Sequence, residues 1–162
     1  MKWLGATILV ACALLTGILL KNRMGRRVKL LGEIIGFTEN AIGKISYGFS
    51  PPEQIISETQ GSFFCRCREL VSELGDVRQG WRACVETYKD IALLRKEEKE
   101  LISQIGRSLG AYDADRQISA MKHYSDELVR MRTKAFEEYS ENGRLCVTCS
   151  ALVGAFTALL VI

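Results

Sequence analysis

Apolar residues gather at the two ends of this 162-residue chain, and a mixture of apolar and polar positions fills its middle. Residues 3–20 and 145–162 carry no charge, and each run is 18 residues long. An α-helix of that length spans roughly 27 Å, close to the roughly 30 Å hydrocarbon thickness of a membrane. The pattern therefore predicts a transmembrane helix in residues 1–20, a soluble domain in residues 21–144 and a second transmembrane helix in residues 145–162.

A cleaved signal peptide is the alternative interpretation of the first run. Its apolar stretch is too long for a signal peptide, and no pair of small residues forms a cleavage site before Lys21. A retained transmembrane helix is therefore the favoured interpretation.

In the middle segment, apolar residues recur every three to four positions, which is typical of amphipathic helices. The first such helix covers residues 26–47 and continues from the first apolar run. Further helices are predicted over residues 52–59, 63–74, 81–94, 95–109 and 113–142, with Gly61, Gly75 and Gly80 among the stop signals. No stretch sustains the alternation of a β-strand. The predicted fold class is all-α, a helical bundle of about six helices flanked by two transmembrane helices.

Residues with strong positional preferences set the expected helix ends. Ser50 is predicted as an N-cap with Pro51 at the first helical position. Gly110 suits the position after a helix C-terminus, and Asp113 suits the next N-cap, because its carboxylate meets the positive end of the helix. These two residues predict a tight αα-hairpin.

The helix that follows Asp113 carries a narrow heptad-like seam that we interpret as core. The seam consists of Met121, Tyr124, Leu128, Met131 and Ala135. A break is predicted at Gly143, before the second apolar run.

Glycines at helical spacing predict close contacts between helices. Gly106 and Gly110 lie four residues apart, so a neighbouring helix can approach that face closely. We expect that neighbour to be the following helix, which carries Gln117, Met121 and Leu128. Gly32, Gly36 and Gly43 fall on roughly one face of the first helix of the middle segment, where either close packing against another helix or local fraying would explain them.

Charge argues against nucleic acid as a partner. The middle segment holds 21 basic and 19 acidic residues, a net charge of +2, and the signs alternate along the predicted helices. Basic residues are concentrated beside both apolar runs, and such flanks stay on the cytoplasmic side. They are Lys21, Arg23, Arg26, Arg27 and Lys29 after the first run, and Arg130, Arg132, Lys134 and Arg144 before the second. The middle domain is therefore predicted to be cytosolic, with both termini outside.

The residues that carry chemistry do not form a catalytic or metal-binding set. His123 is the only histidine. Cys12, Cys146 and Cys149 fall within the apolar runs, where cysteine serves as a small apolar residue. We therefore predict no enzyme activity, no cofactor and no small-molecule substrate. A membrane-bound thiol or metal sensor that uses Cys65, Cys67 and Cys84 is kept as an alternative.

Three groups of residues together resemble the stage III sporulation protein AB family of endospore-forming bacteria. The first is Leu101…Ile105-Gly106…Leu109-Gly110…Asp113…Gln117, similar to a Leu-Gly-x-x-Leu-Gly-x-x-Asp-x-x-x-Gln signature. The second is Ile45-Ser46-Tyr47…Ser50-Pro51, and the third is Gly143-Arg144-Leu145 with the apolar C-terminal end. Departures from the family pattern occur at Lys44, Pro52, Ile105 and Ser150.

The resemblance implies a two-pass protein of the mother-cell membrane around the forespore, inside the channel complex that links the two cells. Because family members look like F-type platform proteins of type II secretion, it implies that the chain anchors a cytosolic ATPase, the stage III sporulation protein AA. Other membrane subunits of the channel are the further implied partners. Possible partner-binding or structural residues are Tyr47, Pro51, Gly106, Leu109, Gly110, Asp113, Gln117 and Gly143. A general type II secretion or pilus platform subunit is the remaining alternative.

Overall fold

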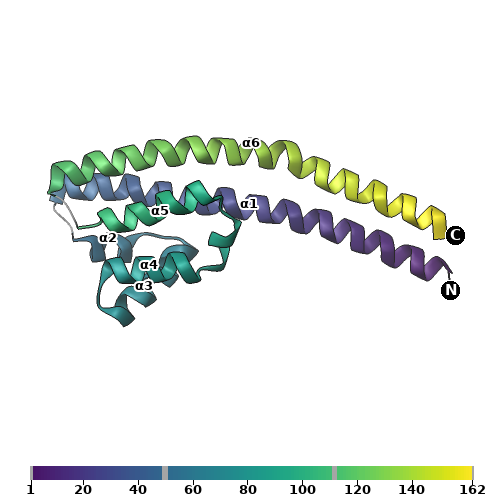
Figure 1. The fold of residues 1–162 in the computed structure, drawn as a ribbon, viewed down its shortest axis with the longest axis horizontal. Helices are drawn as coiled ribbons and strands as arrows, with labels where there is room; N and C mark the ends of the chain where they lie inside the picture. Colours follow the sequence, from purple (N-terminus) through teal and green to yellow (C-terminus); the bar gives the residue numbers. More distant parts are fainter. Residues whose placement is uncertain (1, 49–50, 111–112, 162) are drawn as a thin grey trace. The chain divides into compact units, whose positions relative to one another are not determined.

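The structure, a computed structural model, describes the backbone of residues 2–48, 51–110 and 113–161. Side chains are described within these ranges except at residues 2–7, 9, 48 and 158–161. All regular structure in the described ranges is helical, so the all-α prediction is confirmed (Figure 1). The elements are α1 (Lys2–Gly48), α2 (Pro52–Glu58), α3 (Ser62–Leu74), α4 (Val77–Thr87), the 3₁₀ helix η1 (Lys89–Leu93), α5 (Lys96–Ser108) and α6 (Ala114–Val161).

The chain forms two compact units, each built partly from the two long helices. Unit 1 consists of residues 1–28 and 134–162, and unit 2 consists of residues 29–133. Within the described residues, no helix combines the length and the apolar character that crossing a membrane requires. The two flanking transmembrane helices predicted from the sequence are therefore not supported by the fold.

An aromatic cluster forms the centre of unit 2. Phe37 of α1, Phe63 and Phe64 of α3 and Trp81 of α4 are all buried. Their ring centroids lie 5.0 Å apart for Phe37 and Phe64, and 5.4 Å apart for Phe63 and Trp81. Pairs at these separations contribute beyond the burial of their apolar area. The cluster therefore joins α1 to the consecutive helices α3 and α4.

The seam predicted on the last helix is confirmed as core. Met121 and Leu128 of α6 are fully buried and Ala135 is nearly so, while Tyr124 and Met131 are partly buried. Spacing of three and four residues was enough to identify this face because it depends only on the helical repeat.

Helix α4 begins four residues earlier than the sequence pattern predicted. Asp76 is its N-cap, and the Asp76 carboxylate accepts a hydrogen bond from the Gln79 N–H at 2.8 Å. Gly80 therefore lies inside the helix, and its prediction as a stop is wrong. A methyl group at Gly80 would lie 2.7 Å from Cα of Val71, so this glycine lets α4 approach the α3 backbone.

Three other predictions about helix ends are also wrong. Helix α2 begins at Pro52, as its predicted range had it, but Pro51 is its N-cap and not its first helical residue, and Ser50 lies outside the described residues. Helix α6 continues without a break through Gly143, which is buried beside the side chains of Lys21 and Tyr139. The predicted break at Gly143 is therefore wrong, and a methyl group there would make only ordinary contacts with these two side chains. The predicted helix over residues 81–94 is divided at Tyr88, where the backbone is extended between α4 and η1.

Candidate functional site

The eight residues singled out from the sequence divide into an exposed set and a buried set. Tyr47, Pro51, Gly110 and Asp113 are exposed. Gly106, Leu109, Gln117 and Gly143 are buried. Only the first set can contact a partner directly, and its role in binding stays a prediction.

Tyr47 is the most exposed large hydrophobic side chain in the described part of unit 2. It lies in the last turn of α1, and 95% of its surface is accessible. An exposed tyrosine contributes little to the stability of its own protein, but a partner that covers the ring gains a large, rigid contact area. Tyr47 is therefore a candidate anchor for a binding partner.

Gly110 and Asp113 mark the turn between α5 and α6, as predicted. Gly110 has a φ of 65°, in the left-handed region that favours glycine, and its neighbour is Pro52 of α2. Asp113 directly precedes α6, and its carbonyl oxygen accepts a hydrogen bond from the Gln117 N–H at 2.9 Å. Its carboxylate lies 3.6 Å from Nε of Arg116.

The close contact predicted at Gly106 exists, but the predicted neighbour is wrong. A methyl group at Gly106 would lie 2.1 Å from Cδ1 of Trp81, so the element against this glycine is α4 and not α6. The Trp81 indole is held there by a hydrogen bond from Nε1 to the Ile102 carbonyl oxygen at 2.9 Å. The indole and the bare backbone of Gly106 therefore set the distance between α4 and α5.

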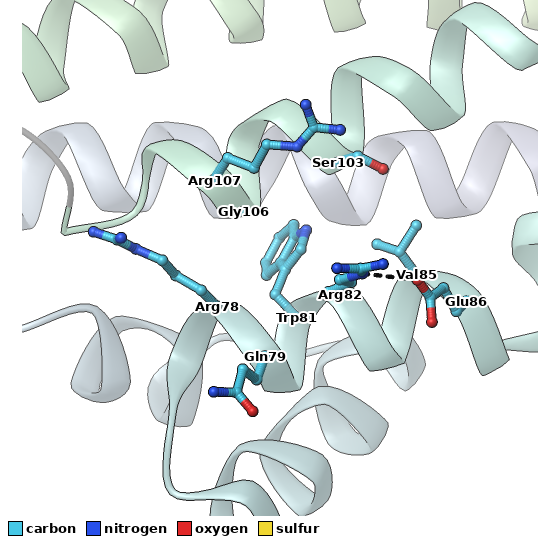
Figure 2. Close-up of a pocket in the computed structure, with 9 residues that line it drawn as sticks. All are labelled: Arg78, Gln79, Trp81, Arg82, Val85, Glu86, Ser103, Gly106 and Arg107. Atoms are coloured by element: carbon cyan, nitrogen blue, oxygen red, sulfur yellow. Dashed lines mark hydrogen bonds and ion pairs between the residues drawn. The ribbon is translucent and has the colours of Figure 1, made fainter.

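A cavity of about 610 Å³ opens beside this contact, within unit 2. Figure 2 shows Trp81 between the two helices, with Arg107 of α5 above it and Arg78 and Arg82 of α4 to either side in this view. Nε of Arg78 donates to the carbonyl oxygen of Leu109 at 3.1 Å, which satisfies a backbone acceptor at the end of α5.

This cavity was missed in the sequence. The pattern offered two signals: Trp81, one of only two tryptophans in the chain, and the four-residue spacing of Arg78 and Arg82 on one helix face.

Two of the three cysteines of unit 2 lie in its core. Cys67 and Cys84 are fully buried, and Cys65 is exposed beside Arg68. A hydrogen bond with the Cys67 side chain and burial raise the pKa of the Cys84 thiol well above its usual range. Because thiolates are the metal ligands and nucleophiles, this arrangement argues against the sensor alternative. Among the described residues, no three His, Cys, Asp or Glu side chains are grouped to hold a metal ion.

Small residues form the contact between α1 and α6 inside unit 1. A methyl group at Gly17 would lie 3.0 Å from the carbonyl oxygen of Cys146, and one at Gly154 would lie 3.2 Å from Cα of Val10. The outward side chains are large and apolar instead. Among the described residues they include Ile8, Leu15, Leu19, Leu145, Leu152, Val153 and Phe156, which are all exposed.

Comparison with known proteins gives one family. A family model described as stage III sporulation protein AB matches residues 2–162. The chain is 22% identical over 171 aligned residues to the stage III sporulation protein AB of Bacillus subtilis (strain 168), and the alignment covers 99% of this chain and 98% of that protein. No solved structure matches the chain.

Proposed function

Since the chain belongs to the stage III sporulation protein AB family, we propose that it is a non-enzymatic membrane component of the channel complex between mother cell and forespore during endospore formation. We further propose that it couples the cytosolic ATPase of that complex, the stage III sporulation protein AA, to the membrane assembly. The observation that carries the proposal is the match of the family model over residues 2–162, which includes both apolar runs and the helical domain between them.

The exterior of unit 1 supports the membrane part of the proposal. Among its described residues, ten large apolar side chains on its two helices are exposed. Large exposed apolar patches mark sites of interaction with membranes or proteins. The interior contact uses Gly17, Ser150 and Gly154 instead. Small residues inside and large apolar residues outside are typical of helix pairs in lipid, where packing drives association. The basic residues at residues 21–29 and 130–144 favour a cytosolic unit 2.

Location and orientation can be measured on the full-length chain in sporulating cells. We expect the protein to sediment with membranes and to resist alkaline carbonate extraction. A reporter that works only in the cytosol should be active when fused at residue 90 and inactive when fused at residue 162. A reporter that works only outside the cytosol should give the opposite result. Release by carbonate, or labelling of residue 90 from outside the cell, would refute the membrane proposal.

Tyr47 provides the test of ATPase coupling. We expect Tyr47→Ala to weaken binding of the ATPase by roughly tenfold or more, because an exposed aromatic anchor typically contributes about 2 kcal/mol or more at an interface. Co-purification and calorimetric titration with the full-length chain would measure it. The melting temperature should stay unchanged, because 95% of the Tyr47 surface is accessible.

Val129→Ala is the matched control, since Val129 is an exposed apolar residue of α6 in the same unit. It should bind the ATPase like the wild type. If the wild-type chain does not bind the ATPase at all, the coupling proposal is wrong; if Tyr47→Ala binds normally, the contact lies elsewhere.

A further inference from the structure

Three arginines line one hollow of unit 2, between α4 and α5. Arg78 and Arg82 belong to α4 and Arg107 to α5, and Glu86 is the only carboxylate among the lining residues of this cavity. The lining therefore carries a net charge of +2, which falls to +1 when Glu100, the ion-pair partner of Arg107 outside the lining, is included. Figure 2 shows the three guanidinium groups on different sides of the Trp81 ring. Such a concentration of positive charge favours an anionic ligand.

Arg78 donates a hydrogen bond to the Leu109 carbonyl oxygen, whereas Arg82 and Arg107 form weak, exposed ion pairs. Nε of Arg82 lies 2.9 Å from Oε1 of Glu86, and Nη2 of Arg107 lies 3.4 Å from Oε1 of Glu100. All four side chains are mostly exposed. Exposed ion pairs of this kind contribute little to stability, and a guanidinium has five N–H donors. A carboxylate of a ligand can therefore bind to Arg82 and Arg107 with little loss of protein stability.

The base of the hollow is rigid. Trp81 is buried there, fixed by its hydrogen bond to Ile102 and by the absence of a side chain at Gly106. Val85 of α4 provides a partly exposed apolar surface in the lining. A fixed base keeps the cationic rim in place before a ligand arrives, which lowers the entropy loss on binding.

We propose that this hollow between α4 and α5 binds an acidic segment of a partner protein, with carboxylates on Arg82 and Arg107 and an apolar side chain against Val85. The arginines and the partly exposed Val85 fit a peptide that alternates acidic and apolar residues. A phosphate group fits less well, because it makes no use of Val85 and carries more negative charge toward Glu86. That the partner is the ATPase rests on the proposed function; the chemistry of the segment does not.

Trp81 fluorescence can follow binding in the hollow, because the Trp81 side chain belongs to its lining. In a full-length Trp3→Phe protein it is the only tryptophan. The probe is a synthetic decapeptide of alternating glutamate and leucine, and the same peptide with glutamine in place of glutamate is its neutral control. We expect a saturable change in Trp81 fluorescence with the acidic peptide only, and weaker binding as the salt concentration rises.

Charge reversal then locates the binding site. Arg82→Glu with Arg107→Glu should weaken peptide binding roughly tenfold or more, because charge-assisted hydrogen bonds to both residues are lost. The matched control is Arg66→Glu with Arg116→Glu. These two arginines also form exposed pairs, with Glu69 and Asp113, and neither lines the hollow. The control should bind the peptide within about twofold of wild type, since its net charge change is the same but its location is not.

The outcomes separate this inference from the proposed function. Absence of a saturable signal, equal weakening in the control pair, or displacement of the peptide by equimolar inorganic phosphate would each overturn the acidic-segment proposal. Co-purification with the ATPase adds a second readout on the same variants. If the peptide binds in the hollow but wild type does not bind the ATPase, the ATPase is the wrong partner and the hollow retains its ligand. If wild type and both double variants bind the ATPase equally and the peptide does not bind, the coupling function stands and this inference fails.

Discussion

Gly106→Ala is expected to lower the stability of the protein by about 3 kcal/mol, at the upper end of what overpacking a core usually does. The added methyl group would lie 2.1 Å from Cδ1 and 2.6 Å from Cγ of Trp81, far inside van der Waals contact. The indole cannot move away easily, because Nε1 is bonded to the Ile102 carbonyl oxygen and the ring packs on Phe37 and Phe63. Either α5 must shift from α4 or the aromatic cluster must repack.

Thermal unfolding of the full-length chain, followed by circular dichroism, measures this effect. Gly36→Ala is the matched control, because Gly36 also lies inside a helix but has no atom within 4 Å of an added methyl group. Alanine should raise stability there by up to about 1 kcal/mol through helix propensity. A Gly106→Ala protein that melts at or above the wild-type temperature would contradict the packing described for α4 and α5.

Trp81→Ala is expected to lower stability by about 3–5 kcal/mol, the range for removing a large aromatic side chain from a core. The change removes the ring contacts with Phe37, Phe63 and Phe64 and leaves the Ile102 carbonyl oxygen without its donor. Tyr47→Ala serves as the control, because that aromatic ring is almost fully exposed and its removal should change stability by no more than about 0.5 kcal/mol. Equal melting temperatures for the two variants would show that Trp81 is not the centre of unit 2.

The two changes should also be strongly coupled. In a Trp81→Ala background the ring that blocks Gly106 is absent, so the additional loss from Gly106→Ala should fall to nearly zero. Residues in contact typically show interaction energies of about 0.5–3 kcal/mol in such cycles. Additive losses would mean that something other than Trp81 limits the space at Gly106.

Local chemistry made several features predictable from the sequence. Gly75 and Gly110 end their helices with φ values of 66° and 65°, and a glycine after a helical pattern is a signal read over a few residues. The apolar seam on α6 was predictable for the same reason. The all-α class followed from these periodicities, and membership of the family from the motif residues 101–117.

Contacts between distant segments were not predictable in this way. Gly80 and Gly143 were interpreted as helix breaks because glycine lowers helix propensity. The structure places both inside helices, and at Gly80 the close approach of the Val71 backbone explains the glycine. At Gly106 the nearest helix in sequence was expected, but the contacting ring belongs to Trp81, 25 residues earlier. The arginines of the hollow lie up to 29 residues apart in the sequence and were not singled out there. Only the side-by-side packing of α4 and α5 brings Arg82 and Arg107 to one cavity.

Unit 2 is closed by a contact between its first and last parts, where Gly32 of α1 lies against the Arg132 side chain of α6. The two residues are 100 positions apart in the chain. At a synthesis rate of about 5–20 residues per second, the ribosome needs roughly 5–20 s to reach Arg132 after Gly32 has been made. During that interval the apolar face of α1, which includes Leu31 and Ile34, stays uncovered because some of the residues that pack against it have not yet been synthesised. The nascent chain must therefore be protected from aggregation for seconds before its domain can fold.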